Sequence, residues 1–360
     1  MKKVLTFFLL WRVSLLALAA ISLLILAKKP SFDHFFNYWL WWDGLHYIGI
    51  AKFGYKESLD YAFFPLLPFI TRFFYQMFPF GNLLFWGLLV SNACTAAAIV
   101  VLFKLIAKQY GQAAALRSTA LLLTFPSAFF LGAFYTEGMF LLLAVTTFYF
   151  ALQRKWAQAS IIAALATATR PVGIVVCLAL FVEYFASVQF DFKKITRQVL
   201  WLAASPLGFF FYLVYLFVRE GDPWLFFKAQ AVWHRSLSLY PWEVFGKEIE
   251  QIIALGTTNG PFLLSRLADL LSSLVFLLLL IPVFKKLPLS YFVYAYGVIL
   301  IPLLTGATTS MFRFVLVAFP MFIIMGLWSK HWLVFTSLLF LQSLLLAVFT
   351  LLFIAGFWVA

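Results

Sequence analysis

The chain has 360 residues, of which 65% are hydrophobic, 21% are aromatic and only 11% are charged. Soluble domains carry about 25% charged residues, so this composition excludes a soluble globular protein and a disordered one. The net charge of +13 is typical of a membrane protein whose cytoplasmic loops collect Lys and Arg beside anionic lipid, and we expect no binding to nucleic acid.

The apolar runs predict an all-α polytopic membrane protein with about 11 transmembrane helices, because most runs approach the ~20 residues that a bilayer requires. The first run follows Lys2 and Lys3 and is too long for a signal peptide, so we predict a membrane span with Arg12 on its cytoplasmic side. The predicted spans are 4–27, 82–106, 115–134, 137–153, 157–170, 172–188, 198–218, 262–284, 288–305, 312–328 and 332–358.

Basic clusters between these runs predict a cytoplasmic N-terminus and an outer C-terminus. This topology requires that segment 61–80, which prolines interrupt, does not cross the membrane but forms a juxtamembrane or re-entrant helix on the outer face. Residues 1–360 then form a single integral-membrane domain. We expect its outward-facing site to be formed by two long outer loops, 28–61 and 219–261.

The first outer loop carries an acid among aromatic residues. Trp42, Asp43, His46 and Tyr47 are close in sequence, and Asp43 and His46 share one face if this segment is helical. A carboxylate that aromatic rings partly shield from water is a candidate general base. The alternative is an interfacial helix that Asp43 caps, or in which it pairs with a lysine.

Three charged residues lie at span ends, where an unpaired charge is costly and often functional. They are Glu137, Arg170 and Arg313. Pro171 breaks the helix beside Arg170, and arginine binds phosphate oxygens through two N–H groups, so a phosphate is a plausible partner. The alternatives are a solvated loop position for Glu137 and contacts with lipid headgroups for the two arginines.

An aromatic run with two prolines begins at Tyr61 and includes Phe64 and Pro65. The prolines prevent a regular helix start and fix the direction of the chain. One interpretation is a rigid entry turn, and the other is one wall of a binding site.

The second outer loop contains Asp222, Gln230 and His234, together with Trp233 and Arg235. Its acids, amides and rings suit a polar or sugar-like acceptor, and simple contact with water is the alternative. No phosphate-binding loop, dinucleotide motif, Gly-x-Ser-x-Gly elbow or His-Glu-x-x-His motif occurs, so nucleotide hydrolysis, hydride transfer and zinc proteolysis are not expected.

Four motifs occur in order along the chain: Trp42-Asp43-Gly44, Ala62-Phe63-Phe64-Pro65, Tyr135-Thr136-Glu137 and Ala168-Thr169-Arg170-Pro171. With these motifs, and with Gly221-Asp222-Pro223 and the Arg313 segment, the chain resembles the PIG-V family of mannosyltransferases in the GT-C superfamily of integral-membrane glycosyltransferases.

The resemblance implies a GT-C-like helical bundle, an outward-facing site, a polyprenyl- or dolichyl-phosphate mannose donor and a glycolipid acceptor. It places the catalytic aspartate at Asp43. Many GT-C enzymes have two adjacent acids there and this chain has one, so we expect no tightly bound metal and no other cofactor. The short chain with trimmed loops resembles a prokaryotic homologue, which predicts the plasma membrane as its location and membrane lipids as its surroundings.

These expectations combine into an inverting transfer of a hexose, by resemblance mannose. Asp43 is the general base, Glu137 orients the acceptor or assists the base, and Arg170, Arg313 and His234 stabilise the leaving phosphate. The alternative is a transporter or flippase for a lipid-linked or anionic solute, but the polar residues cluster outside, which favours the enzyme. The predicted substrate-binding residues are Trp42, His46, Tyr47, Tyr61, Phe64, Pro65, Asp222 and Gln230.

Overall fold

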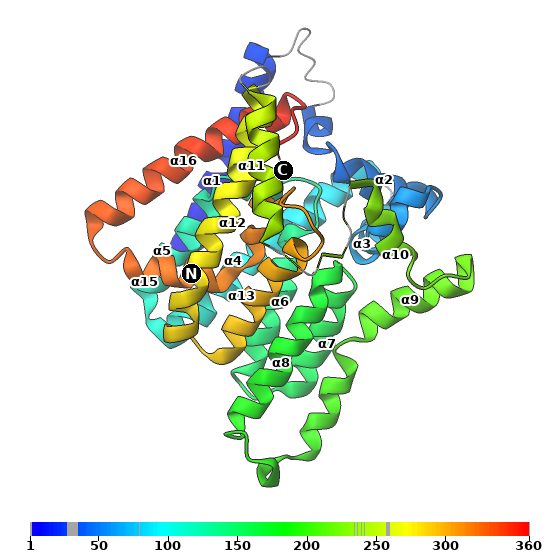
Figure 1. The fold of residues 1–360 in the computed structure, drawn as a ribbon, viewed down its shortest axis with the longest axis vertical. Coiled ribbons are helices and arrows are strands. Elements are labelled where there is room, and N and C mark those ends of the chain that lie inside the picture. Colours follow the sequence, from blue (N-terminus) through cyan, green and yellow to red (C-terminus); the bar gives the residue numbers. More distant parts are fainter. Residues whose placement is uncertain are drawn as a thin grey trace.

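A computed structural model describes residues 2–26, 35–78, 80–233, 235, 237–238, 240, 242–256 and 260–359. These residues contain sixteen α-helices and no β-strand (Figure 1). The α-helices are α1 (Lys2–Leu26), α2 (Asp43–Phe53), α3 (Leu66–Met77), α4 (Leu83–Tyr110), α5 (Gln112–Thr124), α6 (Glu137–Ala151), α7 (Trp156–Thr167), α8 (Ile174–Ser187), α9 (Leu207–Glu220), α10 (Leu225–Ala229), α11 (Glu243–Leu255), α12 (Gly260–Lys286), α13 (Leu289–Leu303), α14 (Met311–Phe314), α15 (Phe319–Trp328) and α16 (Trp332–Ile354).

Short 3₁₀ turns join several of these helices. They are η1 (Phe35–Trp39), η2 (Ser58–Ala62), η3 (Ala128–Leu131), η4 (Pro171–Gly173), η5 (Phe192–Lys194), η6 (Arg197–Ala204), η7 (Gln230–Trp233) and η8 (Val315–Val317).

Five helical segments are long and apolar enough to cross a membrane: Lys2–Ile25, Leu83–Tyr110, Arg197–Glu220, Gly260–Lys286 and Trp332–Ile354. A sixth is obtained if Met311–Val317 and Phe319–Trp328, which are bent by 78°, form one broken span. The prediction of a multi-pass, all-helical membrane protein is therefore confirmed. Several of the other predicted spans contain only helices of 10–17 residues, so the structure supports five or six spans by this criterion.

The predicted span 115–134 shows why apolar sequence overestimates helix length. Helix α5 ends at Thr124, because Pro126 disfavours helical backbone at the preceding residue and has no N–H group to donate. Residues 125–136 continue as turns and η3, and all of them are buried. Irregular backbone is tolerated at membrane depth when protein surrounds it, so this segment can remain apolar without being a helix.

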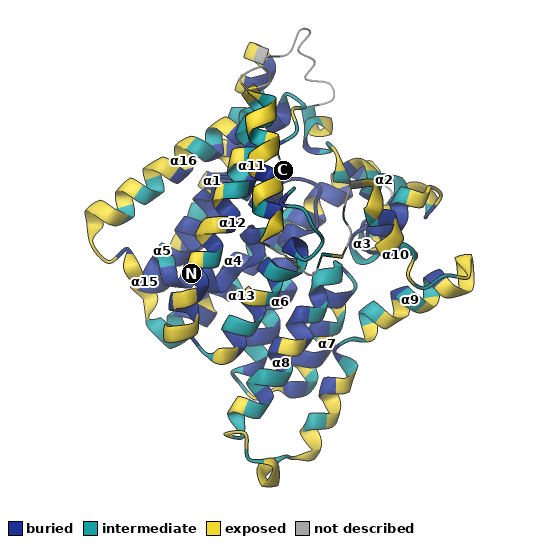
Figure 2. Cartoon of the chain, viewed as in Figure 1, coloured by how far each residue is buried: buried dark blue, intermediate teal, exposed yellow. Residues whose placement is uncertain are grey.

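The long helices pack into a bundle whose outward-facing side chains are largely apolar. Helix α4 contacts α5 and α6, α6 contacts α7, and the first long helix, α1, lies against the last, α16. Figure 2 shows a buried centre, whereas much of α9 and α16 is exposed. Large exposed side chains on these helices include Val218 and Phe340. An apolar outer surface of this kind is what lipid contact requires.

Segment 61–80 contains α3, a helix of 12 residues that is too short to span a bilayer. One face buries Leu67 and Thr71, while Phe69 and Phe73 are exposed. An amphipathic helix of this length is consistent with the juxtamembrane interpretation.

Arg12 does not lie free at a cytoplasmic helix end. Its guanidinium is 4.5 Å from the ring of Trp39, which belongs to the predicted first outer loop. Arg12 is ten residues after Lys2, which places it ~15 Å along α1, and the indole face offers a cation–π contact there. The structure therefore places Arg12 against Trp39 of segment 28–61, and which side of the membrane this contact faces stays a prediction.

Candidate active site

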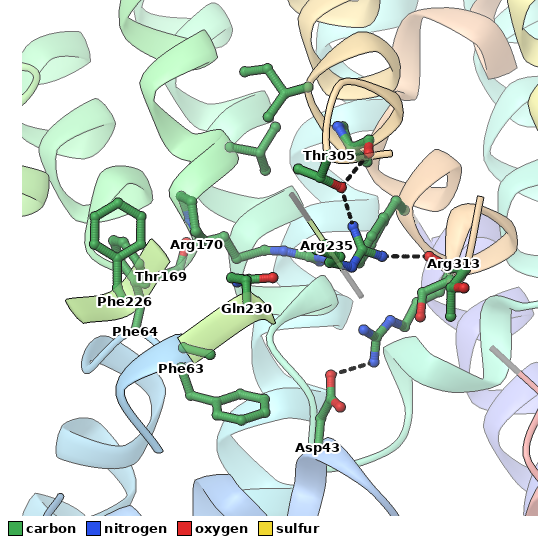
Figure 3. A pocket seen from close by; sticks show the side chains of 18 of the residues that line it. Asp43, Phe63, Phe64, Thr169, Arg170, Phe226, Gln230, Arg235, Thr305 and Arg313 are labelled. Atoms are coloured by element: carbon green, nitrogen blue, oxygen red, sulfur yellow. Dashed lines mark hydrogen bonds and ion pairs between the residues drawn. The ribbon is translucent and has the colours of Figure 1, made fainter. Parts of the chain in front are cut away.

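A cavity of about 220 Å³ lies where segments far apart in the sequence meet (Figure 3). Its walls come from α2, the 62–64 turn, residues 169–172, α10 with Gln230, the end of α13, α14 and Trp358. The lining combines aromatic and aliphatic surface with a few polar and charged side chains, which is the usual character of a small-molecule site.

Asp43 is the first residue of α2, where a negative charge is favourable at a helix N-terminus, and it lines the cavity. Its Oδ2 atom accepts a hydrogen bond from Nη1 of Arg313 at 2.6 Å (Figure 3). Oδ1 accepts no hydrogen bond from the described residues. Asp43 therefore pairs with an arginine of α14, not with a lysine, and keeps one oxygen available toward the cavity.

Glu137 begins α6 and its side chain is only 2% exposed. Oε1 accepts a hydrogen bond from Nη1 of Arg170 at 2.8 Å and lies 3.4 Å from Nε of Arg313, an ion-pair distance without hydrogen-bond geometry. Oε2 has no hydrogen-bond partner among the described residues. Glu137 does not line the cavity, but the two arginines that it contacts do.

Gly138 explains why Glu137 can sit so deep. A Cβ atom at Gly138 would lie 2.1 Å from Oγ1 of Thr95, so only glycine allows α6 to approach α4 this closely. Thr95 is itself fixed, because its hydroxyl donates to the carbonyl of Leu131 at 2.7 Å. The tight contact sets the height of Glu137 relative to α4.

Arg170 lies between the end of α7 and η4, where Pro171 starts the new turn. Its guanidinium contacts Glu137 and packs 5.1 Å from the ring of Phe314. Together the four charged side chains form a connected series, Asp43–Arg313–Glu137–Arg170. Pairing offsets the high cost of burying each charge alone.

Arg313 is held in place by Asp269, an acid of α12 that the sequence did not single out. The Asp269 carboxylate accepts hydrogen bonds from the backbone N–H groups of Ser310 at 3.1 Å and Phe312 at 2.9 Å. These bonds cap α14, and Ser310 has a φ of 67°, a left-handed conformation that such bonds stabilise. An acid within the apolar run 262–284 was the available sequence signal.

Arg235 is a further cation of the cavity lining that was noted in the second outer loop but given no role. Its Nη1 donates to Oγ1 of Thr305 at 2.9 Å and its Nη2 donates to the carbonyl of Thr309 at 2.5 Å. The sequence cannot reveal this position, because Thr305 and Thr309 are about 70 residues away along the chain.

Three predicted substrate-binding residues line the cavity: Tyr47, Phe64 and Gln230. The Tyr47 hydroxyl lies 3.3 Å from Oγ1 of Thr136, and burial raises the pKa of Tyr47 well above its ordinary value. Tyr47 is therefore protonated at neutral pH and can donate a hydrogen bond, but it cannot act as the base.

Trp42 and His46 lie beside the cavity rather than in its wall. His46 bonds to Asp60 and stacks on Phe63, which does line the cavity. Trp42 packs 4.9 Å from the ring of Trp358, another lining residue. Trp42 also has a φ of 53°, so strained backbone precedes Asp43.

Tyr61 and Asp222 make local contacts outside the cavity lining. The Tyr61 hydroxyl donates to Glu220 at 2.5 Å, and Asp222 pairs with Lys228 at 2.6 Å, a contact that lowers the pKa of Asp222. His234 lies outside the described residues. No group of three His, Cys, Asp or Glu side chains that could hold a metal ion occurs in the part of the chain that the structure describes.

Pro65 lines a second, strongly apolar hollow of about 440 Å³. Leu66 and Phe69 of α3, Leu165 of α7 and Leu207 of α9 also contribute to its wall. The two hollows are neighbours, because Phe64 and Thr169 line the cavity while the adjacent Pro65 and Ala168 line the second hollow.

Comparison with known protein families identifies the chain. Residues 11–220 match the family described as Mannosyltransferase (PIG-V), a stretch that includes Asp43, Glu137 and Arg170. No individual curated protein matches the chain. The match covers more than half of the sequence and confirms the resemblance seen in the motifs. The chain therefore belongs to the PIG-V mannosyltransferase family and is a multi-pass integral membrane glycosyltransferase.

Proposed function

We propose that this chain transfers mannose from a polyprenyl-phosphate sugar to a glycolipid acceptor on the non-cytoplasmic face, with inversion at the anomeric carbon. The observation that carries the proposal is the position of Asp43. Its carboxylate lines the cavity, with one oxygen fixed by Arg313 and the other free of hydrogen bonds from the described residues.

In the proposed step, the free oxygen of Asp43 takes the proton of the acceptor hydroxyl. The acceptor oxygen then forms a bond to the anomeric carbon, while the bond between that carbon and the phosphate oxygen breaks. The polyprenyl phosphate leaves with the additional negative charge. Cations fixed in the cavity wall stabilise this charge without having to reorganise.

Arg170 and Arg313 contribute to this positive field, and Glu137 positions both of them. The donor's glycosidic oxygen and phosphate would lie on the arginine side of the cavity. Tyr47 and Gln230 supply hydrogen-bonding groups for the sugar hydroxyls from the same wall lining.

The polyprenyl chain is proposed to occupy the second hollow. Its lining is almost wholly apolar, and it adjoins the cavity at Pro65 and Ala168. A lipid tail bound there would place its phosphate at the cavity entrance. Membrane lipids would surround the exposed apolar faces. The basic connections between helices and the N-terminus would face the cytoplasm. Eleven segments would be embedded in the membrane, in the GT-C arrangement.

The test is transfer of labelled mannose from a purified polyprenyl-phosphate donor to a lipid acceptor by wild type and by Asp43→Asn. The substitution keeps the shape of the side chain and removes the base, so we expect turnover to fall by about 10²- to 10⁴-fold. Asp191→Asn, at an exposed acid, is the matched control and should keep full activity. Near-normal turnover in Asp43→Asn refutes the role of Asp43.

A second arm distinguishes transfer from transport. Wild-type protein in sealed vesicles should form labelled glycolipid on the side where the site opens, without a gradient. Movement of the intact lipid-linked sugar across the bilayer, with no glycolipid formed, would instead support a flippase.

A further inference from the structure

The three arginines that line the cavity are not equally paired with acids. Arg313 is paired with Asp43 at 2.6 Å, and Arg170 is paired with Glu137 at 2.8 Å. Arg235 lines the same cavity, yet within the described ranges it makes no ion pair and bonds only to a threonine hydroxyl and a backbone carbonyl. Among the described residues, Arg235 is therefore the cation of the cavity wall that no carboxylate contacts directly, and Asp269 and Asp43 act on it only at longer range.

The Arg235 guanidinium is fixed rather than free to follow solvent. The two hydrogen bonds hold both Nη atoms, and the ring of Phe314 lies 5.2 Å from the guanidinium carbon. A guanidinium has five N–H groups, and the two bonds use two of them, so three remain for a ligand. Burial lowers the pKa of Arg235 to about 10, which still leaves it charged at neutral pH.

Figure 3 shows where this charge lies. The Arg235 guanidinium lies between Arg170 and Arg313 in this view, beside Thr305, while Asp43 lies at the lower end, across from Thr305. A ligand that contacts both Arg235 and Asp43 must therefore bridge the cavity. An anionic group at one end and a reacting hydroxyl at the other satisfy this geometry.

We propose that Arg235 is the primary binding residue for the phosphate of a lipid-linked ligand in this cavity. The assignment rests on the proposed function. It gives the phosphate to Arg235 in place of Arg170 and Arg313, whose charges the Glu137 and Asp43 carboxylates already neutralise. The shared chemistry is a phosphate ester on a lipid. Its source is the polyprenyl-phosphate donor or a phosphate carried by the acceptor lipid.

The test measures binding without turnover. Purified wild type, Arg235→Gln and Arg235→Lys are titrated with polyprenyl phosphate that carries no sugar, with inorganic phosphate as competitor, and separately with the acceptor lipid. Loss of a charge-assisted, two-pronged contact should weaken polyprenyl phosphate binding by roughly ten- to a hundredfold in Arg235→Gln. Arg235→Lys keeps the charge, so its affinity for polyprenyl phosphate should lie between that of wild type and that of Arg235→Gln.

Lys247→Gln is the matched control, because Lys247 is an exposed cation of the same loop region that does not line the cavity. Melting temperatures of all variants separate misfolding from lost affinity. Weakened binding of the acceptor alone would keep the phosphate at Arg235 and assign it to the acceptor. Unchanged affinity for both ligands in a folded Arg235→Gln variant overturns the proposal.

The same titration in Asp43→Asn keeps the two proposals separate. This variant should bind polyprenyl phosphate at least as tightly as wild type, because Asp43 is assigned to the acceptor hydroxyl and its loss frees the Arg313 charge. If Asp43→Asn retains turnover while Arg235→Gln loses phosphate affinity, the assigned base is wrong and the phosphate site stands.

Discussion

Asp43 and Arg313 are separated by 270 positions in the sequence, yet Nη1 of the arginine donates to Oδ2 of the aspartate at 2.6 Å. The contact joins the first residue of α2 to the four-residue helix α14. The contact orients the proposed base. It also pairs the charge of the Asp43 carboxylate, which shares Arg313 with the Glu137 carboxylate. Function and stability are therefore coupled at this pair.

Arg313→Met should destabilise the protein strongly, because it leaves the Asp43 and Glu137 carboxylates without their shared cation. Removing one partner of a buried pair typically costs about 3–5 kcal/mol. Thermal unfolding in detergent measures the change. Adding Asp43→Asn should recover part of the lost stability, since the unpaired charge disappears. Strictly additive losses in the double variant would argue against direct pairing.

Asp269→Asn should displace α14 and thereby weaken activity through Arg313. The carboxylate accepts two backbone hydrogen bonds at a buried site, and an amide has only one acceptor oxygen. One lost bond leaves a buried N–H unsatisfied, at a cost of about 1–3 kcal/mol. The temperature of thermal unfolding and kcat/KM should both fall.

Asp191→Asn is the comparison for this substitution. The Asp191 carboxylate also accepts a hydrogen bond from a backbone N–H group, that of Lys193. Because this hydrogen bond is exposed to solvent, weakening it should change the free energy of unfolding little. Equal effects of the two substitutions would contradict a special role for Asp269.

Gly138→Ala should lower stability by about 1–3 kcal/mol, because the new methyl group overlaps Oγ1 of Thr95 and pushes α6 away from α4. In a Thr95→Ala background the same substitution should cost less, since the overlapping atom is gone. The measurement is the free energy of unfolding of wild type, Gly138→Ala, Thr95→Ala and the double variant. An undiminished penalty in the double variant would show that the contact is not the cause.

Leu165→Trp should fill part of the second hollow and impair long-chain donors more than short-chain ones. The expected signature is a raised KM for polyprenyl donors with little change for a donor that has a truncated tail. Leu178→Trp is the control, because Leu178 is exposed on α8 and does not line the hollow. A uniform effect on both donors would place the lipid tail elsewhere.

The charged residues of the site were the most predictable part of the molecule. Glu137, Arg170 and Arg313 stand out because a charge in apolar sequence needs a partner, and the structure supplies those partners among themselves. Their pairing was not predictable, since composition and spacing carry no information about which distant charges meet. The same reasoning, applied to α12, would have found Asp269.

Helix lengths and side-chain direction were less predictable. Hydropathy alone cannot distinguish a helix from buried irregular backbone, as residues 125–136 show. Asp43 and His46 do lie three positions apart on one helix, α2, but the spacing did not reveal that His46 bonds to Asp60 and Asp43 to Arg313. Tertiary partners decided which way each side chain pointed.

The distribution of the paired charges along the chain has a consequence for biosynthesis. Asp43 and Glu137 leave the ribosome long before Arg313 is made, and Trp358 of the cavity wall is made later still. A nascent chain that stops before α14 already holds Arg170 beside Glu137, but the cation that pairs with Asp43 does not yet exist. Asp43 can therefore reach its paired state only after α14 has been inserted beside α2.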